Sequence, residues 1–488
     1  MTRLFALAFV FLLATLTGAP ALQAAAAADD DAIVHALNRL TYGPRPGDVD
    51  RVRAVGLRKW IDLQLTPATE GAENVRAAEG TNQIDGQMPG DPQKRNWQIV
   101  AASEAKLLRA VYSERQLEEV LVDFWFNHFN VFAGKGQTRN YIIEYERDAI
   151  RPYVLGNFRD MLGATAKSPA MLFYLDNWLS SGAGGAMGAG GARVRGAGAG
   201  AQRARAQGAR AQGAGAQGAN TQGANTQAAN TQAAAVPSAG ARRSNGINEN
   251  YARELLELHT LGVDGGYTQD DIVNVAKAFT GWTMQPRQGT GFVFARGRHD
   301  RSQKIVLGKT IRPGGVEEGE QVLDIVAAHP ATARHIATKL AVRFVSDNPP
   351  ASLVDRAAAT FTATKGDLRE VVKVILLSPE FASPAARRVK VKTPLEFVAS
   401  ALRATGADVR GTLTLAQTLR EMGMPLYLCQ PPTGYDETAT TWVSAGALVS
   451  RMNFAVDLSK NALRGVRVPL SEEQTVALKI GAPEFQRQ

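Results

Sequence analysis

Apolar residues recur every three or four positions along most of the chain, the spacing that places them on one face of an α-helix. The pattern runs through residues 30–43, 113–132 and 268–282, and through most of residues 319–423. Two stretches instead resemble β-strands, "GFVFARG" and "KIVLGKTI", and we expect them to pair with each other. The chain is therefore predicted to be mainly α, a large multi-helix single domain with one short β-hairpin and a long disordered internal loop.

Three helix boundaries can be predicted from residue type. Ser113 and Gln116 have the spacing of a capping box, and so do Thr268 and Asp271. A proline directly after His329 indicates that one helix ends there and another begins.

The first 28 residues have the pattern of a secretory signal: Arg3, an apolar run from Leu4 to Leu16, and then small residues. We expect residues 1–28 to be removed and the mature protein to be exported, to the periplasm or outside the cell. No later stretch approaches about 20 consecutive apolar residues, so no transmembrane segment is expected after cleavage.

Residues 181–247 consist mainly of Gly, Ala, Gln, Asn and Arg, and lack the large apolar side chains that offset the entropy of ordering. We expect this insert to be a disordered loop. It is either a surface loop whose length has changed without a functional role, or a basic segment that tethers the protein to anionic envelope polymers. Residues 29–180 and 248–465 then form the two parts of one helical domain, and residues 466–488 a C-terminal tail.

The formal net charge of +9 is concentrated in the insert, which carries seven arginines and neither acid nor lysine. Arg3 leaves with the signal, so 9 − 7 − 1 leaves about +1 for the rest. We therefore do not expect a specific nucleic-acid partner. The single cysteine, Cys429, excludes an internal disulfide and a cysteine-cluster metal site.

Two helices carry histidines among apolar residues. In "NENYARELLELHTLG", Glu249, Arg253 and Glu257 form a charge ladder, while His259 lies within the apolar arc. In "LEEVLVDFWFNHFNVF", His128 lies within the apolar arc, and Asp123 and Asn127 belong to a narrow polar strip. Buried imidazoles and carboxylates need partners.

Two interpretations of these residues remain open. They converge on a metal or substrate, or they form hydrogen-bond networks that lock helices together. Under the first, the candidate catalytic residues are Asp123, His128, Glu249, Glu254, His259, His299 and Asp300. Asp123 or Glu254 would act as the base, the two helical histidines as metal ligands or acids, and Asn250 as an orienting donor.

Few other residues or motifs point to a reaction or a cofactor. His299 and Asp300 lie at the mouth of the predicted hairpin, where loops often carry function. His35, His329 and His335 are expected to be ordinary helix or helix-end residues. No haem, nucleotide or flavin motif is present, and a divalent metal remains an open cofactor of unknown identity.

Several sequence blocks resemble a large bacterial family known only as a domain of unknown function, number eighteen hundred. They are "RLTYGPRPGDVDRVRAVGLRKWIDLQL", "FWFNHFNVF", "NENYARELLELHTLGVDGGYTQDDIVNVAKAFTGW", "HDRSQKIVLG", "KTPLEFVASALRATG" and "QPPTGYDETATTWVSAGALVSRMNFA". The match spans about residues 33–460, and the insert is the main departure from the family pattern.

The resemblance implies an exported, helix-rich protein without an assigned activity, whose partner comes from a second exported family similar to sulfatases and alkaline phosphatases. The block residues taken as candidate substrate-binding positions are Trp125, Asn127, Asn250, Arg253 and Trp282. Two functions follow as hypotheses. One is a binding or assembly partner of an exported hydrolase; the alternative is a metal-dependent or acid–base hydrolase with its site between the helices carrying His128 and His259.

Overall fold

The computed structural model describes residues 30–66, 97–182, 246–285, 290–469 and 473–488. The described residues before and after the insert belong to one compact unit. The predicted signal peptide lies outside the described residues, as do residues 183–245 of the predicted disordered loop.

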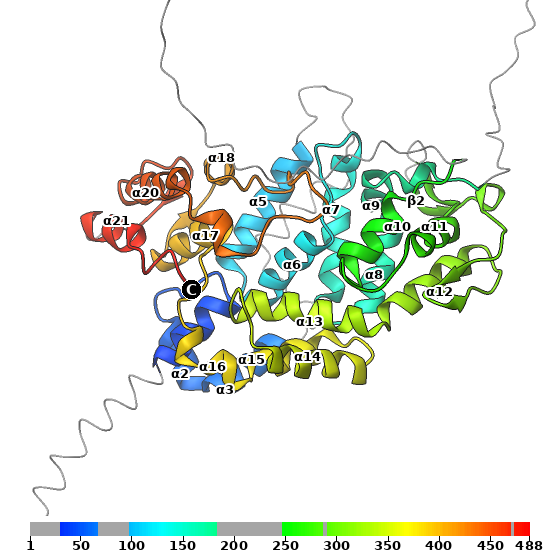
Figure 1. Ribbon diagram of the computed structural model, residues 1–488. Coiled ribbons are helices and arrows are strands. Elements are labelled where there is room, and N and C mark those ends of the chain that lie inside the picture. The colour runs from blue at the N-terminus through cyan, green and yellow to red at the C-terminus, as the bar shows by residue number, and fades with distance from the viewer. Residues whose placement is uncertain (1–29, 67–96, 183–245, 286–289, 470–472) are drawn as a thin grey trace, which may run out of the picture. The chain divides into compact units, whose positions relative to one another are not determined.

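The described chain is mainly helical, as predicted (Figure 1). Residues 30–40 are helical, and further helices follow: α2 (Asp48–Val55), α3 (Leu57–Leu65), α5 (Trp97–Tyr112), α6 (Gln116–His128), α7 (Ile142–Glu144), α8 (Phe158–Lys167), α9 (Pro169–Tyr174), α10 (Asn250–Glu254), α11 (Gln269–Ala278), α12 (Val316–Ala327), α13 (Pro330–Phe344), α14 (Ala351–Ala363), α15 (Leu368–Leu376), α16 (Pro379–Ala382), α17 (Pro394–Ala404), α18 (Leu413–Glu421), α19 (Ala439–Trp442), α20 (Ala445–Ser459) and α21 (Glu473–Gly481). Two π-helical turns, η3 (Tyr145–Ile150) and η6 (Leu255–His259), continue α7 and α10.

The strands pair differently from the prediction. β1 (Trp282–Gln285) pairs with β2 (Thr290–Phe294), and β3 (Ile305–Val306) pairs with β4 (Lys309–Thr310). The stretch "KIVLGKTI" folds back on itself because Leu307 and Gly308, with φ of 49° and 74°, close a two-residue turn between its halves. The predicted pairing of "GFVFARG" with "KIVLGKTI" is therefore wrong. A third pair joins β5 (Asp408–Val409) to β6 (Val466–Arg467).

Two of the three predicted helix boundaries are confirmed. Thr268 and Asp271 form a capping box at the start of α11, and His329 caps α13. The predicted box at Ser113 does not form, because Gln116 is turned to other partners. Its Nε2 donates to backbone carbonyls at the end of α5, and its Oε1 accepts from the Tyr42 amide at 3.0 Å.

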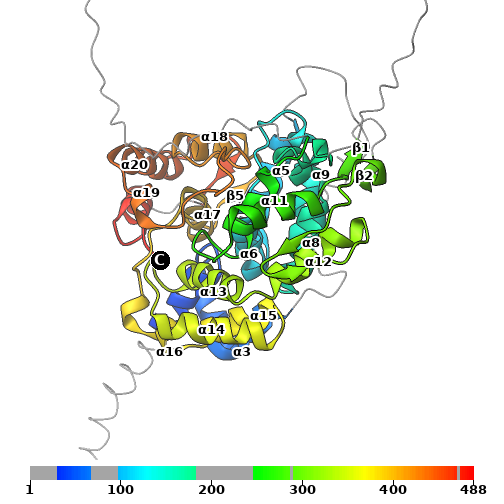
Figure 2. The same cartoon turned by 45° about the vertical axis from the view of Figure 1, so that its right-hand side comes forward.

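α6 is buried nearly all round, as its apolar pattern predicts. It contacts α3, α5 and η3, and both views place it among the other helices (Figures 1 and 2). The buried aromatic residues around it include Trp125, Phe129, Tyr145 and Phe158. α6 ends at His128, so the core fixes the position of that imidazole.

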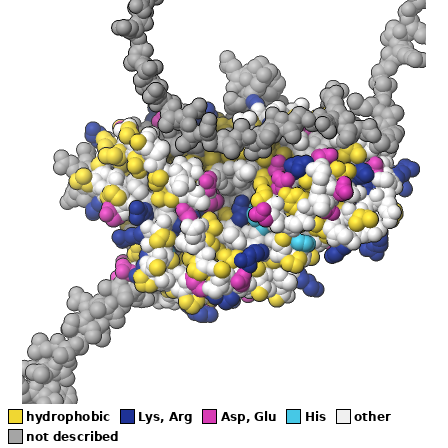
Figure 3. Space-filling view, in the orientation of Figure 1, with side chains coloured by type: hydrophobic (Ala, Val, Ile, Leu, Met, Phe, Trp, Pro, Cys, Tyr) yellow, Lys and Arg dark blue, Asp and Glu magenta, His cyan; other side chains and the backbone are white. Residues whose placement is uncertain are grey.

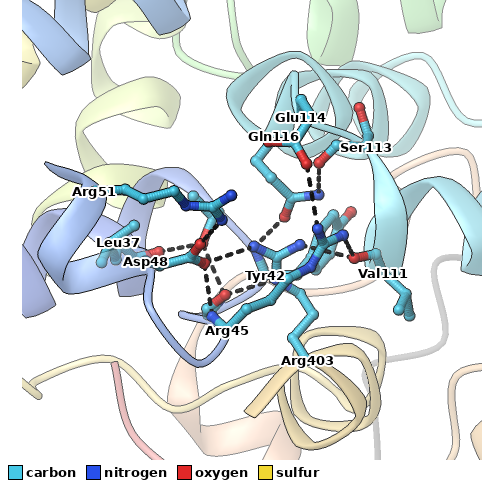
Figure 4. Close-up of polar contacts among 12 residues, drawn as sticks. Leu37, Tyr42, Arg45, Asp48, Arg51, Val111, Ser113, Glu114, Gln116 and Arg403 are labelled. Atoms are coloured by element: carbon cyan, nitrogen blue, oxygen red, sulfur yellow. Dashed lines mark hydrogen bonds and ion pairs between the residues drawn. The ribbon is translucent and has the colours of Figure 1, made fainter. Parts of the chain in front are cut away.

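The block "RLTYGPRPGD" joins the first helix to α17 (Figure 4). Arg403 donates to the carbonyls of Gly43 and Val111 at 2.6 and 2.8 Å, and lies 3.4 Å from Asp48. These contacts satisfy the polar groups of a buried turn, so this block has a structural role.

The stretch named as a C-terminal tail is ordered where it is described. α21 packs on α20. The last residues reach α17, where Gln488 donates to Glu396 at 2.8 Å.

Candidate functional site

The ends of α6 and η6 bring the two predicted histidines together. The ring centroids of His128 and His259 are 6.3 Å apart, and both side chains are buried. A third imidazole, His335 on α13, lies 6.1 Å from His128. We call these three residues the histidine centre.

Two of these imidazoles cap the carbonyl end of η6. His128 Nε2 lies 3.1 Å from the His259 carbonyl, and His335 Nε2 lies 3.2 Å from the Leu258 carbonyl. A carbonyl only accepts, so each Nε2 carries the proton and each Nδ1 keeps a lone pair. The last carbonyls of a helix need such donors. The centre therefore stabilises the end of the "NENYARELLELH" segment.

Two ring nitrogens of the centre remain without a partner among the described residues. They are His128 Nδ1 and His259 Nε2, and both are sealed from solvent. Trp125, whose ring lies 5.3 Å from that of His128, packs beside them and its Nε1 is also unpaired. A buried polar atom without a partner calls for an explanation, and one explanation is a ligand.

All three imidazoles are held neutral. Burial, and then the charge of Lys339, lower the pKa of His259 to about 3 and that of His335 to about 4. The pKa of His128 is also well below its usual range, from burial first and then from Lys339. Lys339 lies on α13, four residues after His335, so it occupies the same helix face.

A loop before α19 borders the centre and is held by the polar strip of α6. The Asn127 side chain donates to the Tyr435 carbonyl at 2.8 Å and accepts from the Tyr435 amide at 2.7 Å. Asn130 donates to the carbonyls of Cys429 and Pro431. Asn127 thus fixes the loop that carries Glu437, whose pKa is raised by burial.

Glu254, at the end of α10, is the candidate catalytic residue with the most suitable proton affinity. Burial, and then the charge of Glu257, raise the pKa of its carboxyl to about 7. No hydrogen bond or ion pair to Glu254 is found among the described residues. A half-buried carboxyl that exchanges its proton near neutral pH is suited to acid–base chemistry.

Asp123 lies in a separate network. Its Oδ1 is 2.9 Å from Lys106 Nζ, which also lies 3.4 Å from Glu146. Glu146 in turn contacts Arg109 and Arg151. Asp123 therefore ties α6 to α5.

The charge ladder predicted along the "NEN" segment is present. Arg253 lies 3.5 Å from both Glu249 and Glu257. Glu249 also accepts from Gln269 at 2.9 Å. Asn250 is exposed. These contacts form on a half-exposed face and join α10 to α11.

His299 and Asp300 belong to a third network. His299 Nδ1 donates to the Thr280 carbonyl at 2.9 Å, and its Nε2 lies 3.2 Å from Glu318. Asp300 accepts from the Ser302 amide at 2.9 Å, and Lys304 bridges the Asp300 carbonyl and Glu318. Trp282 is buried close to Gly319, where an added Cβ would lie 2.4 Å from its ring.

The structure thus brings His128 and His259 together, with Trp125 beside them, and places Asp123, Glu249, His299 and Asp300 in other networks. Sequence reasoning missed His335, Lys339 and Glu437. The four-residue spacing of His335 and Lys339 on one helix face was the available signal. Glu437 gave no such signal, because its contact with Asn127 joins residues 310 positions apart in the sequence. Figure 3 shows histidine, acidic and basic side chains close together near the middle of the face in view.

A second feature is the outer face of α20. Its inner face buries Phe454, Ala455 and Leu458. Its outer face exposes Leu448, Val449, Met452 and Val456, by 41, 57, 58 and 40%. Hydrophobic side chains gather over α20 in Figure 3. We call these four residues the α20 row.

A family model described as a protein of unknown function, DUF1800, matches residues 35–486. The chain belongs to the DUF1800 family. No curated protein and no solved structure matches it. Within the part of this DUF1800 chain that the structure describes, no three His, Cys, Asp or Glu side chains are arranged to hold a metal ion. The described helices include none with the length and apolarity needed to cross a membrane.

Proposed function

We propose that this DUF1800 protein is an exported binding and assembly protein that works beside an exported hydrolase of the sulfatase or phosphatase type. Export rests on the signal predicted for residues 1–28, and the partner class rests on the family resemblance. The observation that supports a binding role is the α20 row.

α20 carries apolar residues on both faces, with Asn453 and Asp457 also exposed on the outer one, and only the inner face is covered. Adjacent exposed apolar side chains, rather than scattered ones, mark contact surfaces for other proteins. The row therefore fits a partner that covers the outer face of α20 with an apolar surface of its own.

The test is a complex between the purified mature protein and an exported sulfatase-like or phosphatase-like protein from the same organism. In the variant Val449→Asp/Met452→Asp, two carboxylates would be buried on binding, so we expect affinity to fall at least about 100-fold. Val263→Asp is the matched control, because Val263 is 67% exposed in a loop remote in sequence from α20. Equal affinity of the two variants, or no complex with the wild type, would overturn the proposal.

Glu254 supports a second candidate function, that of a hydrolase that either depends on a divalent metal or uses acid–base chemistry alone. Its pKa of about 7 and its freedom from ion pairs among the described residues are the favourable observations. The purified protein would be assayed on glycans, esters and phosphoesters, with and without added divalent metals. Turnover that is lost in Glu254→Gln, with an unchanged melting temperature, supports this candidate; no turnover on any substrate excludes it.

A further inference from the structure

Positive charge in this chain is concentrated in two segments. The insert, residues 181–247, carries seven arginines and neither acid nor lysine. Residues 277–316 carry eight lysines and arginines and a single acid, Asp300, so their net charge is 8 − 1 = +7. Subtracting both segments and Arg3 from the total, 9 − 7 − 7 − 1, leaves −6 for the rest of the chain. The second segment is therefore a basic region on an otherwise acidic protein.

The fold leaves most of this positive charge without a counter-charge. Asp300 lies 3.6 Å from Lys304 and accepts from the Ser302 amide at 2.9 Å, so the one acid of the segment is already engaged. Lys304 also lies 2.7 Å from Glu318 of α12. Four exposed bases of the segment form no ion pair with a described carboxylate: Arg296, Arg301, Lys309 and Arg312. We call these four residues the basic surface.

Backbone contacts hold the basic surface in one compact region between β2 and α12. Arg296 begins the turn η7 (Arg296–Arg298), and the Ile311 amide donates to the Lys304 carbonyl at 2.9 Å, next to the β3–β4 pair. The Lys304 ammonium donates to two carbonyls of the loop that carries Arg301. Lys and Arg side chains line the edge of the molecule in Figure 3 at which Figure 1 draws this segment. Glu317, exposed at the start of α12, offsets one of the four charges.

Both ends of the insert lie beside the basic surface. The Gly182 amide donates to the Arg298 carbonyl at 2.8 Å, and the Ser181 amide donates to the Gly246 carbonyl at 2.9 Å. The Arg298 guanidinium donates to two carbonyls of the chain just before the insert. The insert therefore leaves and re-enters the fold next to the other basic segment. Like charges repel one another, so a polyanion would stabilise this arrangement.

We propose that the basic surface binds an anionic glycan of the cell envelope, a polymer with carboxylate or phosphate groups along its length. Guanidinium groups pair with both of these groups. A repeating polyanion contacts several separate cations at once, which suits four bases spread over one surface. The arginines of the insert add to the positive field that attracts such a polymer.

The partner class follows from two further observations. The proposal rests on the export proposed above, which places the protein among envelope polymers rather than nucleic acids. The exposed described residues of 277–316 include no aromatic side chain on which nucleic-acid bases would stack. The proposal does not depend on the α20 row.

The experiment is a binding titration of the full-length mature protein with polygalacturonate, phosphorylated dextran, uncharged dextran and double-stranded DNA. Each titration is run at low and at physiological salt. We expect saturable binding of the charged glycans that weakens at least about tenfold at the higher salt, because salt ions compete for the bases. Tighter binding of polygalacturonate identifies carboxylate as the recognised group, tighter binding of phosphorylated dextran identifies phosphate, and equal binding identifies a receptor for both.

The decisive variant neutralises the basic surface: Arg296→Gln/Arg301→Gln/Lys309→Gln/Arg312→Gln. Its matched control removes the same charge from exposed bases elsewhere: Arg58→Gln/Lys59→Gln/Lys460→Gln/Arg464→Gln. Both variants keep the insert, so a difference between them reports where the charges lie. We expect the first to weaken glycan binding at least about tenfold and the second less than about threefold.

Both variants should keep the melting temperature of the wild type, because the substituted side chains are exposed. The smaller variant Arg296→Gln/Lys309→Gln, which leaves the contact of Arg312 with Gln321 intact, should still weaken binding at least about threefold. All of these variants retain the α20 row, so a complex with the exported hydrolase should form as before. The two proposals can therefore fail separately.

Four results would overturn the proposal. They are no binding of either charged glycan at low salt, equal affinity of the decisive and control variants, equal binding of uncharged dextran, and tighter binding of DNA than of both charged glycans.

Discussion

Replacing Lys106 by methionine tests whether the polar strip of α6 is structural. The substitution keeps the apolar stem and removes the ammonium, which lies 2.9 Å from Asp123 and 3.4 Å from Glu146. Burial alone would raise the pKa of Glu146, but Lys106, Arg151 and Arg109 together lower it from 4.5 to about 2.

The magnitude is set by the cost of breaking a buried ion pair, and the pKa of Glu146 gives the scale of the whole cluster. The difference, 4.5 − 2 = 2.5, corresponds to about 3 kcal/mol at about 1.36 kcal/mol for each pKa unit, and this is the net effect of burial and of all the partners of Glu146 together. Breaking a buried ion pair by removing one partner costs about 3–5 kcal/mol. Because Glu146 keeps two arginines, we expect Lys106→Met to lose about 3 kcal/mol of unfolding free energy at pH 7, the lower end of this range.

The pH dependence has a defined sign. A carboxyl whose pKa is lowered by folding stabilises the protein above pH 4.5, and this stability is lost as pH falls toward 2. Lys106→Met raises the pKa of Glu146, so the loss of stability over this range should be less steep than in the wild type.

The assay is urea unfolding of both proteins between pH 2 and pH 8, with exposed Lys460→Met as a control expected to change stability by less than about 0.5 kcal/mol. A Lys106→Met protein within about 0.5 kcal/mol of the wild type at pH 7 would show that this ion-pair cluster does not stabilise the fold. A partner lost from Asp123 with no loss of stability would return Asp123 to the list of functional candidates.

Three further predictions concern single positions. Gly434→Ala should destabilise by at least about 1 kcal/mol in urea unfolding, because Gly434 has φ of 75° and an added Cβ would lie 2.3 Å from the Asn127 carbonyl; a neutral effect would mean that the loop is not held there. Lys392→Met should raise the unfolding free energy at pH 6, since burial lowers the pKa of Lys392 from 10.5 to about 7 and stability is lost as pH falls through that range; a fall in stability would contradict this. Thr268→Ala should lower the melting temperature by the loss of a cap worth about 1 kcal/mol, and an unchanged melting temperature would argue against the capping box at α11.

Features that depend on the local spacing of apolar residues could be predicted from the sequence. Helical spacing identified α6 and its buried face, and the apolar arcs correctly placed His128 and His259 in the interior. The sequence could not show that the two histidines lie close together, because contacts between residues 131 positions apart depend on how the helices pack.

The rest of the site depends on tertiary contacts that no local pattern encodes. Asp123 had the residue type and helix position of a catalytic base, yet its partner Lys106 comes from α5. His335 followed an ordinary helical pattern, and only the packing of α13 against η6 brings it to the centre. The β-pairing was wrong for a related reason: the left-handed backbone at Leu307, an unfavourable residue for it, was not expected.

The most direct test of the central claim is the tautomer and charge of the three imidazoles, measured by ¹⁵N NMR as a function of pH. We predict that His128 and His335 are neutral with the proton on Nε2, and that all three rings stay neutral at pH 6.5. Rings of His128 and His259 that titrate near their ordinary pKa of 6.5, or a proton on Nδ1 of His128, would contradict it.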